Sequence, residues 1–197
     1  MTAFTPSTIA ALIIAASFAA GLNVYATVLT LGLLAHTHWA MLPPGLEILG
    51  DWVVIAVSGT LFAVEFVADK IPGLDMIWNA LHTFIRVPVA GLLAYRASSH
   101  LSPEMQLLAT VAGAAIAMVA HSSKTAVRAV VTPSPEPVSN IVLSTGEDGI
   151  AIGLMWLVTQ HPWTAASIAI AFIVIALLMT RWVVGALRRT WRRVQTI

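Results

Sequence analysis

Hydrophobic residues in this chain form long runs, each about as long as a membrane-crossing helix. A bilayer core requires about 20 mostly apolar residues per helix. Six runs predict six spans, approximately residues 9–36, 49–69, 76–96, 105–130, 138–159 and 164–187, and a basic interfacial tail follows at 188–197. The pattern predicts an all-α integral membrane protein in which residues 1–197 form a single transmembrane domain.

The first run is interrupted at Gly21, Leu22 and Asn23. Gly weakens a helix interior, and Asn competes for backbone hydrogen bonds or caps a new helix. Two interpretations follow: one long helix with a weak point near its middle, or two half-helices that meet at mid-depth as a re-entrant pair. We favour the single helix, because Gly is common in membrane helices.

Residues 74–85 alternate apolar and polar positions at helical spacing, with Asp75, Asn79, His82 and Arg86 forming the polar set. This pattern predicts a short amphipathic helix that lies at the membrane interface or re-enters the bilayer. The third span then includes part of this stretch or bends at Pro88. A weak internal two-helix repeat is a further expectation, because the second and fourth runs end alike, near Lys70 and Lys124.

Composition agrees with a membrane protein and narrows its partners. Hydrophobic residues make up 58% of the chain and charged residues 10%, against about 25% charged in soluble domains. A net charge of +1 gives no basic field for nucleic acid. The chain has no Cys, which excludes disulfides and thiolate metal sites. We expect the lipid bilayer as partner, no nucleic acid and no cofactor.

Positively charged residues predict the orientation. With six spans, Lys70, Arg86, Lys124, Arg128 and every arginine from Arg181 onward share one side, and Arg96 alone lies on the other. Lys and Arg collect on the cytoplasmic side. We therefore expect a multi-pass inner-membrane protein with both termini in the cytoplasm. A re-entrant first segment would instead place the N-terminus outside.

Ionisable residues at one end of the apolar runs are the main functional signal, because each costs about 2.5–3.5 kcal/mol inside a bilayer. Glu65 and Asp69 share a helix face beside Lys70, and His121, Lys124 and Arg128 share another. Asn140, Ser144 and Glu147 form a third polar stripe that continues to Asp148, near mid-membrane. Asn23 and Tyr25 beside the first break complete the candidates. The expected substrate or ion pathway comprises Asn23, Tyr25, Glu65, Asp69, Lys70, His121, Lys124, Arg128, Asn140, Ser144, Glu147 and Asp148.

Several of these stretches together carry a resemblance. They are GLNVY at 21–25, EFVADKIPG at 65–73, LHTFIR at 81–86, HSSK at 121–124 with Arg128, SPEP at 134–137 with Ser139 and Asn140, and Glu147-Asp148. In this order they resemble a bacterial membrane-protein family catalogued as domain of unknown function 4126. The resemblance implies a small multi-pass inner-membrane protein and supplies no activity.

The favoured hypothesis is a small transporter or channel with a charged polar cavity open to the cytoplasm, coupled to protons or cations. In it, Glu147 or Glu65 carries the proton or cation, and a small ion or solute is the substrate. Two alternatives stay open: an intramembrane enzyme acting on a lipid or isoprenoid phosphate, and a structural or accessory membrane protein. The small-residue stretch 113–117 predicts a homodimer, because small residues allow close helix contact.

Overall fold

The computed structural model describes residues 4–71, 73–131 and 137–194, and within them the chain is helical. The helices are α1 (Pro6–Leu22), α2 (Val24–His36), the 3-10 helix η1 (Pro44–Gly50), α3 (Trp52–Ala68), α4 (Leu74–Ala97), α5 (Pro103–Val131), α6 (Pro137–Gln160) and α7 (Pro162–Val194). Most of the proline-rich connection, 132–136, and the last residues of the basic tail, 195–197, lie outside the described residues. The tail otherwise continues α7.

The structure confirms an all-α fold with several candidate membrane spans. Among the described residues, α4, α5, α6 and α7 are each long and apolar enough to cross a bilayer. A fifth candidate is η1 with α3, which meet at a bend of 67°. Together with the shorter apolar helices α1 and α2, these elements agree approximately with the six expected spans.

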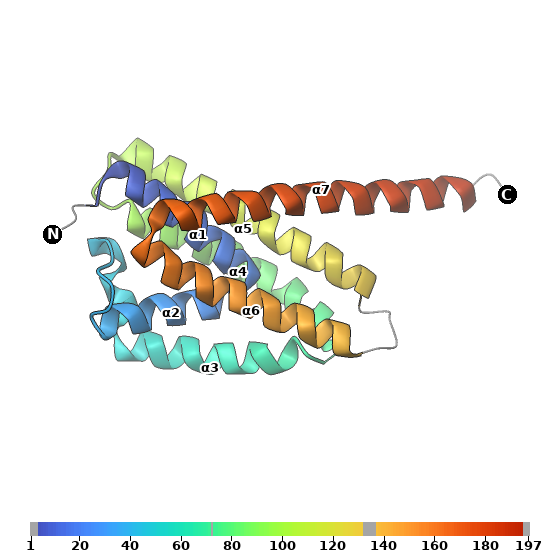
Figure 1. The fold of residues 1–197 in the computed structure, drawn as a ribbon, viewed down its shortest axis with the longest axis horizontal. Coiled ribbons are helices and arrows are strands. Elements are labelled where there is room, and N and C mark those ends of the chain that lie inside the picture. The colour runs from blue at the N-terminus through green and yellow to red at the C-terminus, as the bar shows by residue number, and fades with distance from the viewer. Residues whose placement is uncertain (1–3, 72, 132–136, 195–197) are drawn as a thin grey trace.

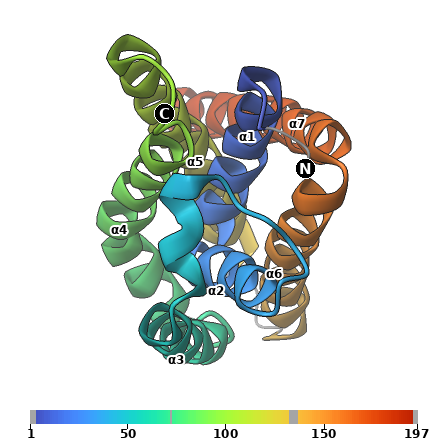
Figure 2. The same ribbon diagram turned by 90° about the vertical axis from the view of Figure 1, so that its left-hand side faces the viewer.

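The first run of the chain forms a re-entrant pair rather than the favoured single helix. In both views α1 enters the bundle, and α2 turns back toward the end from which α1 began (Figures 1 and 2). Asn23 makes the turn with an extended backbone (φ −148°, ψ 104°), and its side chain accepts a hydrogen bond from the N–H of Ala26. The Asn23 N–H donates to the carbonyl of Ala19, so one residue caps both helices.

The helix α1 lies at the centre of the bundle, where it contacts α4, α5, α6 and α7 (Figure 2). Small residues allow this packing. A Cβ added at Gly21 would lie 2.6 Å from the carbonyl oxygen of Ala117 on α5, and one added at Gly113 would lie 2.7 Å from the Cβ of Ala94. Gly113 and Ala117 therefore pack inside the protomer, which removes the stated reason for a homodimer. The homodimer itself stays a prediction.

The amphipathic stretch is the first part of α4 and not a separate interfacial helix. The helix continues through Pro88 to Ala97. Its polar residues are buried: Asp75, Asn79, His82 and Arg86 are each at most 4% exposed. The polar face of this helix therefore points into the bundle, while Ile77, Leu81 and Phe84 are exposed on its outer surface.

The two ends of the bundle differ in what they carry. The end at which α3, α5 and α7 finish holds the connections α3–α4 and α5–α6 (Figure 1). The start of α1 lies at the opposite end, with the α2–α3, α4–α5 and α6–α7 connections. The first end is where the ionisable residues of the four helices α3–α6 converge.

Candidate functional site: a buried ionic cluster

Eight ionisable side chains from α3, α4, α5 and α6 meet inside the bundle, and we call them the ionic cluster. Its members are Glu65, Asp69, Asp75, Arg86, Lys124, Arg128, Glu147 and Asp148. Seven of them are at most 4% exposed, and the Glu147 side chain is 13% exposed. Seven of these side chains contact one another through ion pairs, and Asp148 lies beside them and bonds Asn23.

Helical spacing brings these residues to one place. Glu65 on the last turn of α3 and Asp69 at its C-cap lie four residues apart, so they share a face. Lys124 and Arg128 repeat that spacing on α5. Because α3 and α5 finish at the same end of the bundle, the two carboxylates meet the two cations there (Figure 1).

Lys124 links three parts of the fold. Its Nζ lies 2.8 Å from Asp69 Oδ2, 3.2 Å from Glu147 Oε2 and 4.0 Å from Glu65 Oε1. The same ammonium donates to the carbonyl oxygen of Leu22 at 3.1 Å. That carbonyl belongs to the last turn of α1, so Lys124 fixes the tip of the re-entrant pair to α3 and α6.

Arg128 makes the largest number of contacts in the cluster. One terminal nitrogen, Nη2, lies 2.7 Å from Glu147 Oε2 and 3.2 Å from Asp69 Oδ2. The other, Nη1, lies 3.4 Å from Asp75 Oδ2 and donates to the Asp69 carbonyl and to Asn140 Oδ1. The planar guanidinium can direct five N–H donors at once, which suits this position better than a Lys ammonium would.

Arg86 on α4 pairs with Glu65 and fixes the state of His121. Its Nη2 donates to Glu65 Oε1, and its Nη1 lies 2.9 Å from both Asn79 Oδ1 and His121 Nδ1. Arg has only donors, so His121 Nδ1 must accept. The imidazole is therefore neutral with its proton on Nε2, which donates to Thr83 Oγ1 at 2.7 Å.

Asp148 differs from the other carboxylates of the cluster. Its Oδ1 accepts a hydrogen bond of 2.8 Å from Asn23 Nδ2, at the break between α1 and α2. Among the described residues, no Lys or Arg nitrogen lies within 4.0 Å of it, and its Oδ2 has no hydrogen-bond partner. The side chain is nevertheless 4% exposed.

Lys70 and Ser144 form the edge of the cluster that faces the α3–α4 connection. Lys70 Nζ lies 3.2 Å from Ser144 Oγ and 3.0 Å from the Phe66 carbonyl, above the Phe66 ring. Lys70 is half-buried, and this burial lowers the pKa of its ammonium below the ordinary value. The partners of Lys70 described here, the Ser144 hydroxyl, the Phe66 carbonyl and the Phe66 ring, are thus all neutral.

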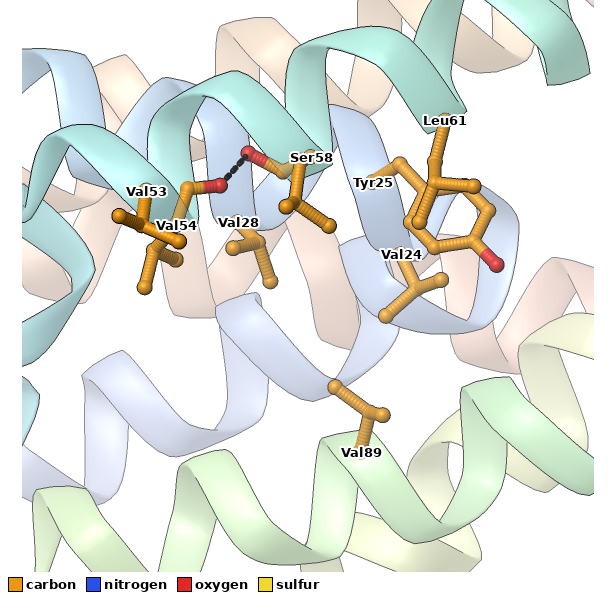
Figure 3. Close-up of a pocket in the computed structure, with 9 residues that line it drawn as sticks. Val24, Tyr25, Val28, Val53, Val54, Ser58, Leu61 and Val89 are labelled. Atoms are coloured by element: carbon orange, nitrogen blue, oxygen red, sulfur yellow. Dashed lines mark hydrogen bonds between the residues drawn. The ribbon is translucent and has the colours of Figure 1, made fainter.

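Tyr25 joins the site indirectly. Its hydroxyl lies 3.1 Å from His82 Nε2, and His82 Nδ1 donates to the Trp78 carbonyl at 2.7 Å. Tyr25 also borders a groove of about 310 Å³ that is lined by valines of α2 and α3 and by Val89 of α4 (Figure 3). Valine side chains line the groove. Ser58, which also lines it, donates a hydrogen bond to the Val54 carbonyl oxygen of its own helix (Figure 3). This groove is apolar and lies beside the ionic cluster.

The structure places eleven of the twelve expected residues in the ionic cluster or at its edge, whereas Tyr25 bonds His82 on α4 and contacts none of the other eleven through the hydrogen bonds described here. Sequence reasoning left four contributors from α4 out of that set: Asp75, Asn79, His82 and Arg86. The helical spacing of these four residues was visible in the sequence. A polar helix face, however, is equally compatible with a position at the membrane interface and with a buried position. Among the described residues, no group of three or more His, Asp or Glu side chains is arranged to hold a metal ion.

Comparison with known proteins places the chain in a family. Residues 10–182 match the model of the family described as Domain of unknown function (DUF4126). No curated protein and no solved structure matches the chain. Since the match spans well over half of its 197 residues, the chain belongs to the Domain of unknown function (DUF4126) family.

Proposed function

We propose that this protein is a small inner-membrane transporter whose ionic cluster forms a gate on the cytoplasmic side. The observation that carries the proposal is the connection between the cluster and the broken first segment. Lys124 bonds the end of α1, and Asp148 bonds the Asn23 cap of α2. Any rearrangement of the ion pairs therefore moves the tip of the re-entrant pair.

Energetics support a switching role for the cluster. Buried ion pairs stabilise a fold little or not at all relative to apolar side chains of the same size, because desolvation offsets their attraction. Seven contacts of 4.0 Å or less between oppositely charged groups are therefore a poor way to hold four helices together. Exchange of partners among several carboxylates and cations, by contrast, offers alternative arrangements of similar energy.

The broken segment supports transport in particular. Transporters often place discontinuous helices near the bilayer midplane, where free backbone groups and helix ends face a substrate or ion. Here the ends of α1 and α2 meet at Asn23, directly beside the cluster. A rigid structural protein has no need of a helix pair that enters the membrane and returns.

Charge balance supports coupling to a proton or other cation. Within the described residues, the cluster holds five carboxylates, of which Asp148 is the one without a nearby cation, against Arg86, Lys124 and Arg128. Even with Lys70 at its edge included, negative charge is in excess. Uncompensated charge in a low-dielectric site is costly, so binding of a small cation would relieve it.

Orientation follows from the positive charges. The end of the bundle that carries Lys70, Lys124, Arg128 and the end of α7 is proposed to face the cytoplasm. Because α1 begins at the opposite end (Figure 1), the N-terminus is then outside and the C-terminus inside. This proposal takes the alternative that the sequence left open for a re-entrant first segment, in place of both termini in the cytoplasm.

Proteoliposomes that contain a pH-sensitive dye test the proposal. With a panel of small ions and solutes outside, the intact protein should dissipate an imposed pH gradient faster than protein-free liposomes for at least one condition. Glu147→Gln should slow this by about tenfold or more, because a gate without these ion pairs cannot close and the transport cycle cannot be completed; a hydrogen bond to a charged group contributes about 1.5–3 kcal/mol. Glu104→Gln, an exposed carboxylate at the other end, is the matched control. Equal rates for intact protein and Glu147→Gln would contradict the proposal.

The two alternatives predict other outcomes of the same work. An enzyme acting on a lipid or isoprenoid phosphate would convert such a compound in detergent, with dependence on Mg²⁺ and no gradient. A structural or accessory protein would dissipate no gradient, and its cluster would be replaceable by apolar side chains without any functional loss.

A further inference from the structure

We infer that Asp148 binds the coupling proton in this conformation and that Lys70 becomes its ion-pair partner once that proton has left. The inference rests on the proposed transport function and gives it a specific ion, a specific carboxyl group and a specific partner. It also replaces Glu147 and Glu65, the carboxylates first favoured as carriers.

Burial without a cation is the first argument. Asp148 is 4% exposed, and its one hydrogen-bond partner among the described residues, the neutral amide of Asn23, lies 2.8 Å from Oδ1. A buried ionised carboxylate without a partner cation costs many kcal/mol in an apolar medium, and such a group normally becomes neutral instead. A protonated Asp148 requires no cation and still accepts the Asn23 hydrogen bond at its carbonyl oxygen.

Comparison within the cluster singles out this group. Glu65 Oε2 and Asp69 Oδ1 are also buried without a hydrogen-bond partner among the described residues. Each of those side chains, however, holds a cation on its second oxygen: Arg86 for Glu65, and Lys124 with Arg128 for Asp69. In the part of the chain that the structure describes, neither oxygen of Asp148 has a Lys or Arg nitrogen within 4.0 Å.

Lys70 lies close enough to become the ion-pair partner of an ionised Asp148. Its ammonium now bonds Ser144, which lies four residues before Asp148 on α6 and so about one helical turn, roughly 5.4 Å, away on the same face. Its present partners, a hydroxyl, a carbonyl and an aromatic ring, are all neutral. The four-carbon stem of Lys is flexible enough to carry Nζ over such a distance.

Other charged groups near Asp148 oppose one another. Lys124 on α5 and Lys70 attract its negative charge, and Asp69 at the end of α3 repels it. Glu147 adjoins it on α6, but its own charge is shared by Lys124 and Arg128. Lys70 is the cation in this group that is not already paired with a carboxylate within 4.0 Å among the described residues.

The proposed step is a simple deprotonation. The O–H bond of the Asp148 carboxyl breaks, the proton passes to water at the side where Lys70 is half-exposed, and the carboxylate takes the Lys70 ammonium. The Asn23 amide then donates to a charged acceptor, and such hydrogen bonds are roughly twice as strong as neutral ones. Loss of the proton thus tightens the contact between α6 and the tip of the re-entrant pair.

Infrared difference spectroscopy of the purified full-length protein in lipid nanodiscs tests this inference. At neutral pH the intact protein should show the C=O stretching band of a protonated carboxylic acid, which shifts in D₂O. The band should be absent from Asp148→Asn and present in both Glu147→Gln and the exposed control Glu104→Gln. Lys70→Met should raise the pH at which the band disappears, because the carboxylate then loses its partner.

Each result decides between the claims. A band that survives in Asp148→Asn, or that is missing from the intact protein, overturns the inference. An unchanged titration in Lys70→Met overturns the assignment of the partner. Because the measurement needs no transport, a correct band with no solute movement would contradict the proposed function while leaving the proton site standing.

Discussion

The pair of Arg86 and Glu65 shows what individual residues contribute to this molecule. Both side chains are 0% exposed, and each would be an unpaired buried charge without the other. Removal of one partner from such a pair typically costs about 3–5 kcal/mol, whereas replacement of both by apolar residues is often neutral or favourable. Variants of this pair can therefore separate an effect on stability from an effect on transport.

We expect Glu65→Met alone and Arg86→Met alone to lower the free energy of unfolding by about 3–5 kcal/mol each. The double variant Glu65→Met with Arg86→Met should recover most of that loss, because no buried charge is left without its partner. Thermal unfolding in detergent measures all three variants. The double variant should nevertheless fail to move protons in liposomes, and full activity in it would favour a purely structural cluster.

Sequence spacing identified many of the charged residues at this scale, but not their pairing. The stripe of Asn140, Ser144 and Glu147 on α6 was recognisable from its intervals of four and three. The sequence could not show that Arg86 holds His121 in its neutral form, because this contact depends on how closely α4 approaches α5. Partners that lie 35 residues apart along the chain are set by tertiary packing.

At the scale of elements, the break at Gly21 and Asn23 determines how the first run folds. Asn23 supplies the cap for α2, and Gly21 permits the close contact of α1 with α5. Both residues were visible in the sequence, and the two interpretations were stated from them. The choice between them could not be made from composition alone, because a membrane tolerates Gly inside a straight helix.

Gly21→Ala tests this close contact. The new Cβ would lie 2.6 Å from the Ala117 carbonyl oxygen and 2.7 Å from the Ala120 Cβ, so α1 and α5 must separate. Overpacking of this kind costs about 1–3 kcal/mol, which should appear as a lower unfolding temperature. Gly153→Ala on α6 is the control, because nothing lies within 4 Å of its added Cβ. Equal unfolding temperatures for the two variants would show that the tip of α1 is not tightly held.

The helix α4 shows the limit of reading an amphipathic pattern. A period of 3.6 residues separates a polar from an apolar face, but it does not say which face points inward. In this bundle the polar face meets charged residues of α3 and α5, so it is buried, and the apolar face lies on the outside of the bundle. Recognising the charged ends of the neighbouring runs as partners for α4 would have predicted this arrangement.

At the scale of the whole molecule, the two ends of the bundle are unequal. The ionic cluster lies at the end at which α3 and α5 finish. The opposite end carries a cavity of about 370 Å³ between the start of α1, the segment around Met41 and the junction of α6 with α7. A transporter that exposes its centre to one side at a time would have one closed and one hollow end.

The most direct test of the gate is the chemical accessibility of Ser144, the buried serine at the edge of the cluster. The chain has no Cys, so Ser144→Cys introduces a single thiol at a position that is 0% exposed in the structure. Ser17→Cys, buried in α1 and away from the cluster, reports general unfolding. Both thiols are probed with a membrane-impermeant maleimide in inside-out vesicles.

With the cluster intact, both thiols should be protected from the reagent. Addition of Glu147→Gln removes the negative charge that pairs with Lys124 and Arg128, so the thiol at 144 should react about tenfold faster or more while the thiol at 17 stays protected. Unchanged protection at position 144, or equal labelling of both thiols, would contradict a cytoplasmic gate made of these ion pairs.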